Sequence, residues 1–306
     1  MVSSENFRRL SLDETIRKTF GIYCAGFKVL TALAAFIVVL DGLLWAICLV
    51  TVVPLLGVDG ESFADPQYLL EHIGQFYAIM GIRMLASTVI SALLMGSMIR
   101  AVIDVYLGVT PDLKACVSVG IKRTPTLLTV SVLGFCGVLL GCLFLIIPGY
   151  YLAIRWFFVT QIVVVEGLGA IASFKRSWTL SKGSWCYIFC TFLIFYIFLI
   201  ILQLVWGTVV VGGSDVNSSM LSLWGSILSI MPAIFFVPIM SIVMTLMYLN
   251  MRIEKEGLNE HVLLRDLGAS GAVDASYSPL VESGANAEST PTSQEPYSDH
   301  VDQEVV

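Results

Sequence analysis

Three charged residues interrupt long apolar runs, and their positions suggest chemistry inside a membrane. Asp41, Arg83 and Arg155 each lie in a stretch that is otherwise almost uncharged. An ionised side chain is costly inside a bilayer unless it is paired, hydrated or able to reach the interface. An inward-facing Asp41 could pair with Arg83 or Arg155, and the guanidinium fork suits phosphate. This arrangement would form a wet pocket for a phosphate or a lipid head group.

A second interpretation needs no ligand. Both arginines could extend to the outer interface, and Asp41 could form a hydrogen bond within the helical bundle. Under either interpretation the sequence offers no catalytic constellation, because Asp41 alone supplies neither a nucleophile with its base nor a set of metal ligands. The three histidines are each followed by an apolar residue, and the seven cysteines form no CxxC or Cys/His cluster of metal-ligand spacing. We therefore expect no enzyme, no metal and no cofactor.

The composition indicates a membrane protein. Of the 306 residues, 57% are hydrophobic and only 13% are charged, and the mean hydropathy is +0.86, whereas a soluble domain has about 25% charged residues. A membrane-spanning helix needs roughly 20 mostly apolar residues. The sequence predicts an all-α, polytopic bundle with six such spans, at about 29–53, 77–99, 126–147, 150–165, 185–211 and 221–249.

Prolines mark irregularities within this pattern. The apolar stretch 126–165 is about twice as long as one span requires, so we expect a hairpin turn at Pro148 and Gly149. The sixth span contains Pro232 and Pro238, which predict a kinked helix.

The basic residues predict the orientation of the spans. Fifteen of the 17 Lys and Arg residues lie before the first span, after the last one, or in the loops that follow spans two and four. The three opposite loops contain none, and the remaining two are Arg83 and Arg155. Because Lys and Arg accumulate in cytoplasmic loops, we expect both termini to be cytoplasmic.

Short amphipathic stretches precede three of the spans. They cover 12–28, 111–125 and 170–183, and each carries a pair of adjacent basic residues. A helix that is apolar on one face and basic on the other lies in the plane of the interface. We therefore predict three short cytoplasmic interfacial helices, although ordinary basic loops would explain the charges alone. Arg100 and Asp104 are spaced as a surface pair on one helix face.

A set of motifs runs from the third span to the end of the sixth. It combines a Pro-Gly turn, a Glu-Gly pair, an Arg-Ser-Trp sequence and a closing Arg-x-x-Lys-Glu-Gly, carried by Pro148, Gly149, Glu166, Arg176, Trp178 and residues 252–257. The combination resembles the glycerophosphoryl diester phosphodiesterase membrane domain family, over roughly residues 10 to 265. The resemblance implies a membrane fold and no activity, because the soluble catalytic barrel of that family is absent here.

Glu166 and Arg176 also permit a structural interpretation. Glu166 ends the fourth span and Arg176 follows ten residues later, so an ion pair between them could dock the third interfacial helix. Trp178 would then anchor that helix at the interface. Ligand binding by these residues is the alternative.

The chain is therefore divided into three parts. Residues 1–28 form a cytoplasmic segment with an interfacial helix, and residues 29–267 form the six-span membrane domain. Residues 268–306 contain seven acidic residues and no Lys or Arg, which predicts a disordered acidic tail that could contact cytosolic proteins. Nucleic acid is not an expected partner, because the chain has no strongly basic surface.

These observations favour a non-enzymatic, multi-pass membrane protein of the plasma membrane or an internal membrane. It would bind or organise membrane lipids through a site that contains Asp41, Arg83 and Arg155. The alternative is a transporter or channel for a small anionic solute that passes Arg83 and Arg155.

Overall fold

The computed structural model describes residues 10–48, 66–144, 146–212 and 219–269. Within these ranges the chain is all-α and contains no strand. Its helices are α1 (Leu12–Ala25), α2 (Phe27–Ile47), α4 (Pro66–Tyr106), α5 (Leu113–Phe144), α6 (Ile146–Arg155), α7 (Val159–Val165), α8 (Ala170–Leu180), α9 (Trp185–Gly212), α10 (Ser219–Glu256) and α11 (Glu260–Ala269). The predicted tail lies almost entirely outside the described residues.

Within the described ranges, six helical segments are long and apolar enough to cross a membrane. They are Phe27–Ile47, Tyr77–Tyr106, Leu113–Leu143, Pro148–Val165, Trp185–Thr208 and Pro232–Glu256. This confirms the predicted all-α class and the six apolar spans, and it indicates an integral multi-pass membrane protein. The fourth span is not one helix, because α6 ends at Arg155 and α7 begins at Val159.

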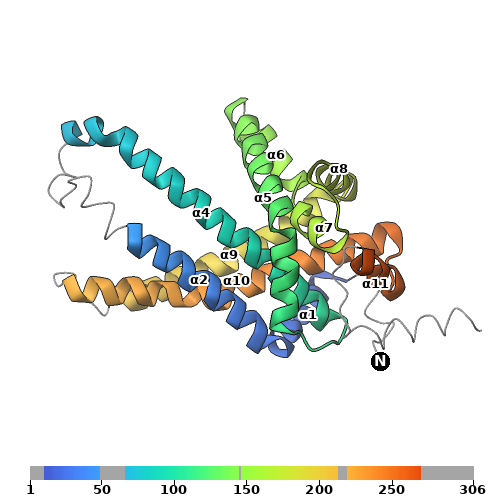
Figure 1. Cartoon of the computed structure of the whole chain (residues 1–306). Helices are drawn as coiled ribbons and strands as arrows, with labels where there is room; N and C mark the ends of the chain where they lie inside the picture. The colour runs from blue at the N-terminus through green and yellow to red at the C-terminus, as the bar shows by residue number, and fades with distance from the viewer. Residues whose placement is uncertain (1–9, 49–65, 145, 213–218, 270–306) are drawn as a thin grey trace, which may run out of the picture.

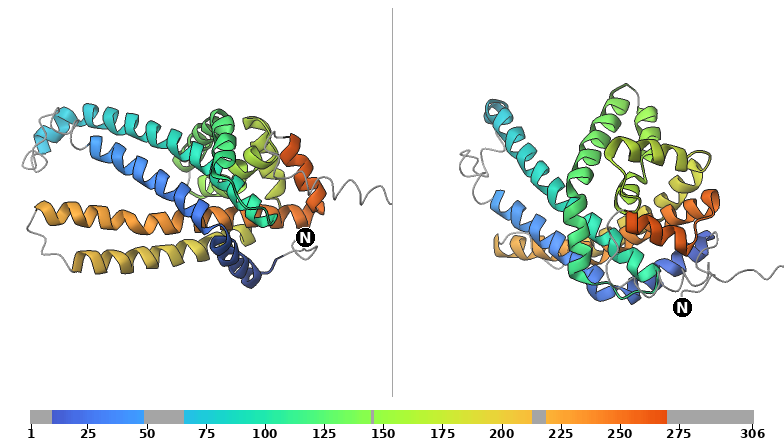
Figure 2. Two further views of the ribbon diagram at one scale, coloured as in Figure 1. Left: turned by 60° about the horizontal axis from the view of Figure 1, so that its bottom comes forward. Right: turned by 45° about the vertical axis from the view of Figure 1, so that its right-hand side comes forward.

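The long helices converge on one end of the molecule. Helices α2, α4, α9 and α10 run side by side, whereas the hairpin of α5 and α6 points in another direction (Figures 1 and 2). The short helices α1, α7, α8 and α11 gather where the long helices meet (Figure 2). The fully buried core lies at this convergence and includes Leu30, Met98, Ile103, Ile162 and Leu246.

Helix α1 begins at a complete capping box. The Ser11 side chain accepts a hydrogen bond from the backbone N–H of Glu14, and the Glu14 carboxylate accepts one from the backbone N–H of Ser11. Two otherwise unpaired helix N–H groups are satisfied in this way. Gly26 separates α1 from α2, and a Cβ there would lie 2.9 Å from the side chains of Leu30 and Val105. A side chain at this turn would therefore require Leu30 and the end of α4 to shift.

The interfacial helix predicted over 111–125 does not exist as a separate element. Helix α5 runs continuously from Leu113 through Pro125 to Phe144. This first part of α5 packs closely on α4, because a Cβ at Gly120 would lie 2.4 Å from the backbone oxygen of Leu93. Cys116 and Val119 are buried in the same contact. The other two predicted stretches do form separate short helices, α1 and α8.

The turn between the third and fourth spans also lies earlier than predicted. Helix α5 ends at Phe144 and α6 begins at Ile146, so Pro148 lies in the first turn of α6, where a missing N–H is tolerated. Gly149 packs on α5 instead of turning, since a Cβ on Gly141 would lie 2.8 Å from the Gly149 Cα. Helix α10 continues through Pro232 and Pro238.

Candidate functional site

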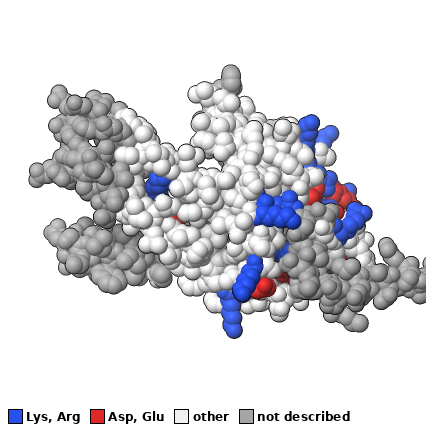
Figure 3. Space-filling model, viewed as in Figure 1, with Lys and Arg blue, Asp and Glu red and all other residues white. Residues whose placement is uncertain are grey.

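The charged side chains gather at the end of the molecule where α8, α10 and α11 meet (Figure 3). Five of them form one network, which we call the charged cluster: Glu166, Arg176, Arg252, Glu256 and Asp266. Two regions far apart in the sequence supply these residues: the end of α7 with α8, and the last turn of α10 with α11. The cluster therefore joins elements that the spans alone would not hold together.

Arg252 lies at the centre of the charged cluster. Its side chain is 5% exposed, and its Nη2 lies 2.8 Å from the Asp266 carboxylate. Its Nε donates to Glu256 at 3.2 Å and lies 3.8 Å from Glu166. Its Nη1 donates to the Tyr248 hydroxyl, which in turn donates to Glu166 at 2.8 Å. A buried arginine with this many acidic partners is satisfied within the fold.

Arg176 connects α8 to the same carboxylates. Its Nε donates to Glu166 at 2.9 Å, and its Nη2 donates to Glu256 at 2.7 Å. Burial of the guanidinium opposes its charge, but the hydrogen bonds and charges of Glu256 and Glu166 outweigh this effect and raise the pKa of Arg176 above its ordinary value. The structure thus brings Glu166 and Arg176 together as the sequence suggested, and it adds Glu256 as a third partner.

Lys255 fixes the end of α8 by a different contact. Its Nζ donates to the carbonyl oxygens of Leu180 and Lys182, at 2.6 and 2.5 Å. These are carbonyls at the C-terminus of α8, where a cation is favoured by the helix dipole.

Asp41 and Arg83 lie together between α2 and α4. Arg83 Nη2 lies 3.8 Å from an Asp41 oxygen, and the Ser87 hydroxyl donates to the same carboxylate. The Arg83 guanidinium also lies over the ring of Trp45, 4.5 Å from its centroid. The side chains of Arg83 and Asp41 are 27% and 41% exposed. Their charges compensate each other, which lowers the cost of placing both in an apolar layer.

Arg155 lies elsewhere, at the end of α6 and against α8. Its guanidinium carbon is 4.4 Å from the ring centroid of Trp178 and 5.5 Å from that of Tyr151. The residue is only 6% exposed, and its Nε is buried without a hydrogen-bond partner. Within the described ranges, no Asp or Glu forms an ion pair with it. Arg155 therefore has aromatic neighbours but no counter-charge.

The structure separates Arg155 from Asp41 and Arg83. The chain bends at residues 156–158, between α6 and α7, and this brings the end of α6 to α8. The hydroxyls of Ser177 and Ser181 donate to the Arg155 carbonyl oxygen, at 2.9 and 3.2 Å. These bonds fix Arg155 at the end where the charged cluster lies, so the three intramembrane charges do not form a single site.

The expectation of a surface pair at Arg100 and Asp104 is also wrong. Their side chains are 1% and 4% exposed, and Arg100 Nε lies 2.6 Å from the Asp104 carboxylate. The Cys116 thiol donates to the other Asp104 oxygen at 3.7 Å. The pair is buried because the start of α5 packs over the end of α4.

Sequence reasoning missed most of the charged cluster. Tyr248, Arg252 and Glu256 follow one another at intervals of four, a spacing that places them on one helix face and could have indicated their contact. Asp266 gave no such signal, because its approach depends on how α11 folds back. Across the described part of the chain, no group of three His, Cys, Asp or Glu side chains could hold a metal ion.

A family model described as a domain of unknown function (DUF7847) matches residues 67–251. The chain belongs to this family. The DUF7847 region extends from the start of α4 almost to the end of α10, so it contains Arg83, Arg155 and Trp178, whereas Asp41 and α1 precede it. No curated protein and no solved structure matches the chain. The match does not connect the chain with the glycerophosphoryl diester phosphodiesterase membrane domain family that its motifs resemble.

Proposed function

We propose that this protein is a non-enzymatic, multi-pass membrane protein that binds an anionic membrane lipid at Arg155. One observation carries the proposal. Arg155 is 6% exposed and lies over the rings of Trp178 and Tyr151, yet no acidic residue of the described chain forms an ion pair with it. Arg176 and Arg252, at the same end of the molecule, each contact at least two carboxylates.

An uncompensated buried charge is unfavourable for the protein alone. Burial of an ion without a partner costs several kcal/mol, and stacking on aromatic rings returns only about 0.5–2 kcal/mol. A lipid phosphate would supply the missing negative charge and accept the hydrogen bonds that the guanidinium can donate. The site is therefore completed by an anion from outside the chain.

The neighbouring aromatic residues favour a lipid as the source of that anion. Trp178 and Tyr151 are 39% and 42% exposed, and such rings prefer the boundary between the acyl chains and the head groups. The charge of Lys255 interacts with those of Glu254, Arg155 and Glu256. A buried guanidinium beside exposed aromatic rings suits an anionic head group at the interface.

The transporter alternative receives less support. It requires Arg83 and Arg155 along one path, but Arg83 contacts Asp41 between α2 and α4, and Arg155 contacts α8. Our proposal includes cytoplasmic termini, on the distribution of Lys and Arg, contacts of the acidic tail with cytosolic proteins, and no nucleic-acid partner. The likeness to the phosphodiesterase membrane domain enters it as a proposal about fold only.

Native mass spectrometry of the purified protein tests the proposal. We would reconstitute the full chain in nanodiscs of phosphatidylcholine and phosphatidylglycerol, transfer it to mild detergent and count the retained lipids. Wild type should retain phosphatidylglycerol, and Arg155→Ala should lose it. Arg265→Ala is the matched control, because Arg265 is 76% exposed at the same end and has only a 3.8 Å contact with Asp266.

Two further variants protect the test against a folding defect. Arg155→Lys keeps the charge but loses the planar fork, and Trp178→Leu removes the ring beside a retained arginine. Both should retain phosphatidylglycerol less well than wild type while remaining monodisperse. Equal retention by wild type and all three variants would contradict the proposal.

A further inference from the structure

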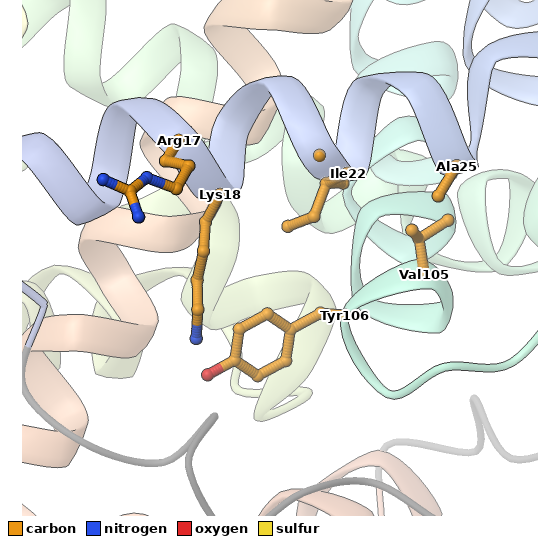
Figure 4. A pocket seen from close by; sticks show the side chains of 7 residues that line it. Arg17, Lys18, Ile22, Ala25, Val105 and Tyr106 are labelled. Atoms are coloured by element: carbon orange, nitrogen blue, oxygen red, sulfur yellow. The ribbon is translucent and has the colours of Figure 1, made fainter.

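A second basic site lies between α1 and the end of α4, away from Arg155. A cavity of about 330 Å³ is lined there by Arg17, Lys18, Gly21 and Ile22 from α1, and by Val105 and Tyr106 from α4. This volume is at the lower end of the range for small-molecule sites. Figure 4 shows Lys18 extending from α1 toward Tyr106, and its Nζ lies 5.5 Å from the ring centroid.

The cavity has a polar end and an apolar end. Arg17, Lys18 and the phenol of Tyr106 form the polar end, whereas Ile22 and Val105 lie together at the other (Figure 4). Gly21 keeps the wall of α1 open, because a Cβ built there would meet no atom within 4 Å. A ligand with one strongly anionic group and a short carbon portion would match this lining.

The other faces of α1 show which way the cavity opens. Thr15, Thr19 and Ile22 face the protein and are buried, and Ile16 and Phe20 form a separate apolar stripe, 39% and 44% exposed. At 3.6 residues per turn, Lys18 lies on the side of α1 opposite that stripe, and Arg17 lies beside the stripe. If the stripe enters the membrane as an interfacial helix does, the cavity opens toward the head groups and water.

We infer that this cavity binds a phosphate monoester group through Lys18 and Arg17. A monoester carries nearly two negative charges near pH 7, and two cations, Arg17 and Lys18, line the cavity. Asp13 pairs with Arg17 at 3.4 Å, but both side chains are more than 80% exposed. Such a pair contributes little, so a dianion can displace it. The inference goes beyond the lipid site at Arg155, since it uses other residues and another surface.

The test uses two probes that share this chemistry. Glycerol 3-phosphate presents the monoester in water, and phosphatidic acid presents it in phosphatidylcholine nanodiscs. Binding of the first is measured by equilibrium dialysis with radiolabelled probe, and retention of the second by native mass spectrometry. Binding of both probes identifies a site for the phosphate group itself, whereas binding of phosphatidic acid alone identifies a head-group site.

Two variants locate the binding in the cavity. Lys18→Ala removes a charge-assisted hydrogen bond, and Gly21→Leu fills the open wall without changing any charge; each should weaken binding at least about tenfold. Gly207→Leu is the matched control, because Gly207 on α9 also has no atom within 4 Å of a built Cβ, and it should bind as wild type does.

The results that would overturn the cavity assignment differ from those that would overturn the proposed lipid site at Arg155. Wild-type protein that binds neither probe, or Gly21→Leu that binds as tightly as wild type, would overturn the cavity assignment. Binding lost in Arg155→Ala but kept in Lys18→Ala would also overturn it, and would leave the lipid site at Arg155 in place. Binding lost in Lys18→Ala and Gly21→Leu, and kept in Arg155→Ala, is the result we expect.

Discussion

The charged cluster and Arg155 lie at the same end of the molecule, but their arginine side chains have different surroundings. Arg252 and Arg176 meet carboxylates from three segments and are satisfied within the chain. Arg155 is buried like Arg252, but among the described residues its guanidinium lies over aromatic rings and forms no ion pair with a carboxylate. We propose that the paired arginines hold the fold, whereas Arg155 is available to a ligand.

The largest expected effect follows from removal of the central arginine of the cluster. Arg252→Met would leave Asp266, Glu256 and the Tyr248 hydroxyl without their shared donor, and loss of one partner of a buried pair costs about 3–5 kcal/mol. The apparent melting temperature in detergent should fall by many degrees. The matched control Arg265→Met removes an exposed arginine and should leave the melting temperature nearly unchanged. A small shift for Arg252→Met would mean that the cluster does not hold α11 and α8.

A similar effect is expected at the buried pair of α4. Asp104→Asn removes the negative charge beside Arg100, whose side chain is 1% exposed, and should cost about 3 kcal/mol. Thermal unfolding monitored by circular dichroism would measure the loss. Asp13→Asn is the control, because Asp13 is exposed. If both variants unfolded at the same temperature, the pair would not stabilise the contact of α4 with α5.

An intermediate effect is expected at the pair within the membrane. Asp41→Asn keeps a hydrogen-bonding group opposite Ser87 and Arg83, and Arg83 keeps its contact with Trp45. Because both charged side chains are partly exposed, the loss should be about 1 kcal/mol. Reversible unfolding in mixed detergent would measure it. A loss of unfolding free energy as large as that of Arg252→Met would mean that Asp41 is as important for the fold as the charged cluster.

The smallest effect on stability is expected at α1. Arg17→Ala removes an exposed pair with Asp13, which contributes about 0–1 kcal/mol and less at high salt. The melting temperature should therefore match that of wild type at both low and high salt. A clear salt-dependent loss would show that Arg17 supports the fold instead of remaining available to an anion.

The sequence predicted those features of the fold that depend on residues close together in the chain. Six apolar segments could be predicted because each depends only on its own composition, and α1 and α8 could be recognised as separate short helices. The contact of Glu166 with Arg176 was suggested by position alone, since one residue ends a span and the other follows within a short loop. Periodicity did not predict that residues 113–125 would be part of α5. The periodicity of this segment gives no sign of the close contact that Gly120 makes with α4.

The candidate site was harder to predict, because its partners depend on tertiary structure. Asp41, Arg83 and Arg155 were grouped as three costly charges, but the bend at 156–158 carries Arg155 to α8. Asp266 reaches Arg252 only through the return of α11. Which charge lacks a partner was therefore not readable from the sequence, although every charge in question was visible there.

The most direct test measures stability and lipid retention on the same two variants. Arg252→Met and Arg155→Ala each remove one buried arginine from the same end of the molecule. We expect Arg252→Met to lower the melting temperature strongly and Arg155→Ala to lower it little, whereas phosphatidylglycerol, counted by native mass spectrometry on the folded fraction, should be lost only from Arg155→Ala. If Arg155→Ala retained the lipid and unfolded as readily as Arg252→Met, both arginines would serve the fold and the account would be wrong.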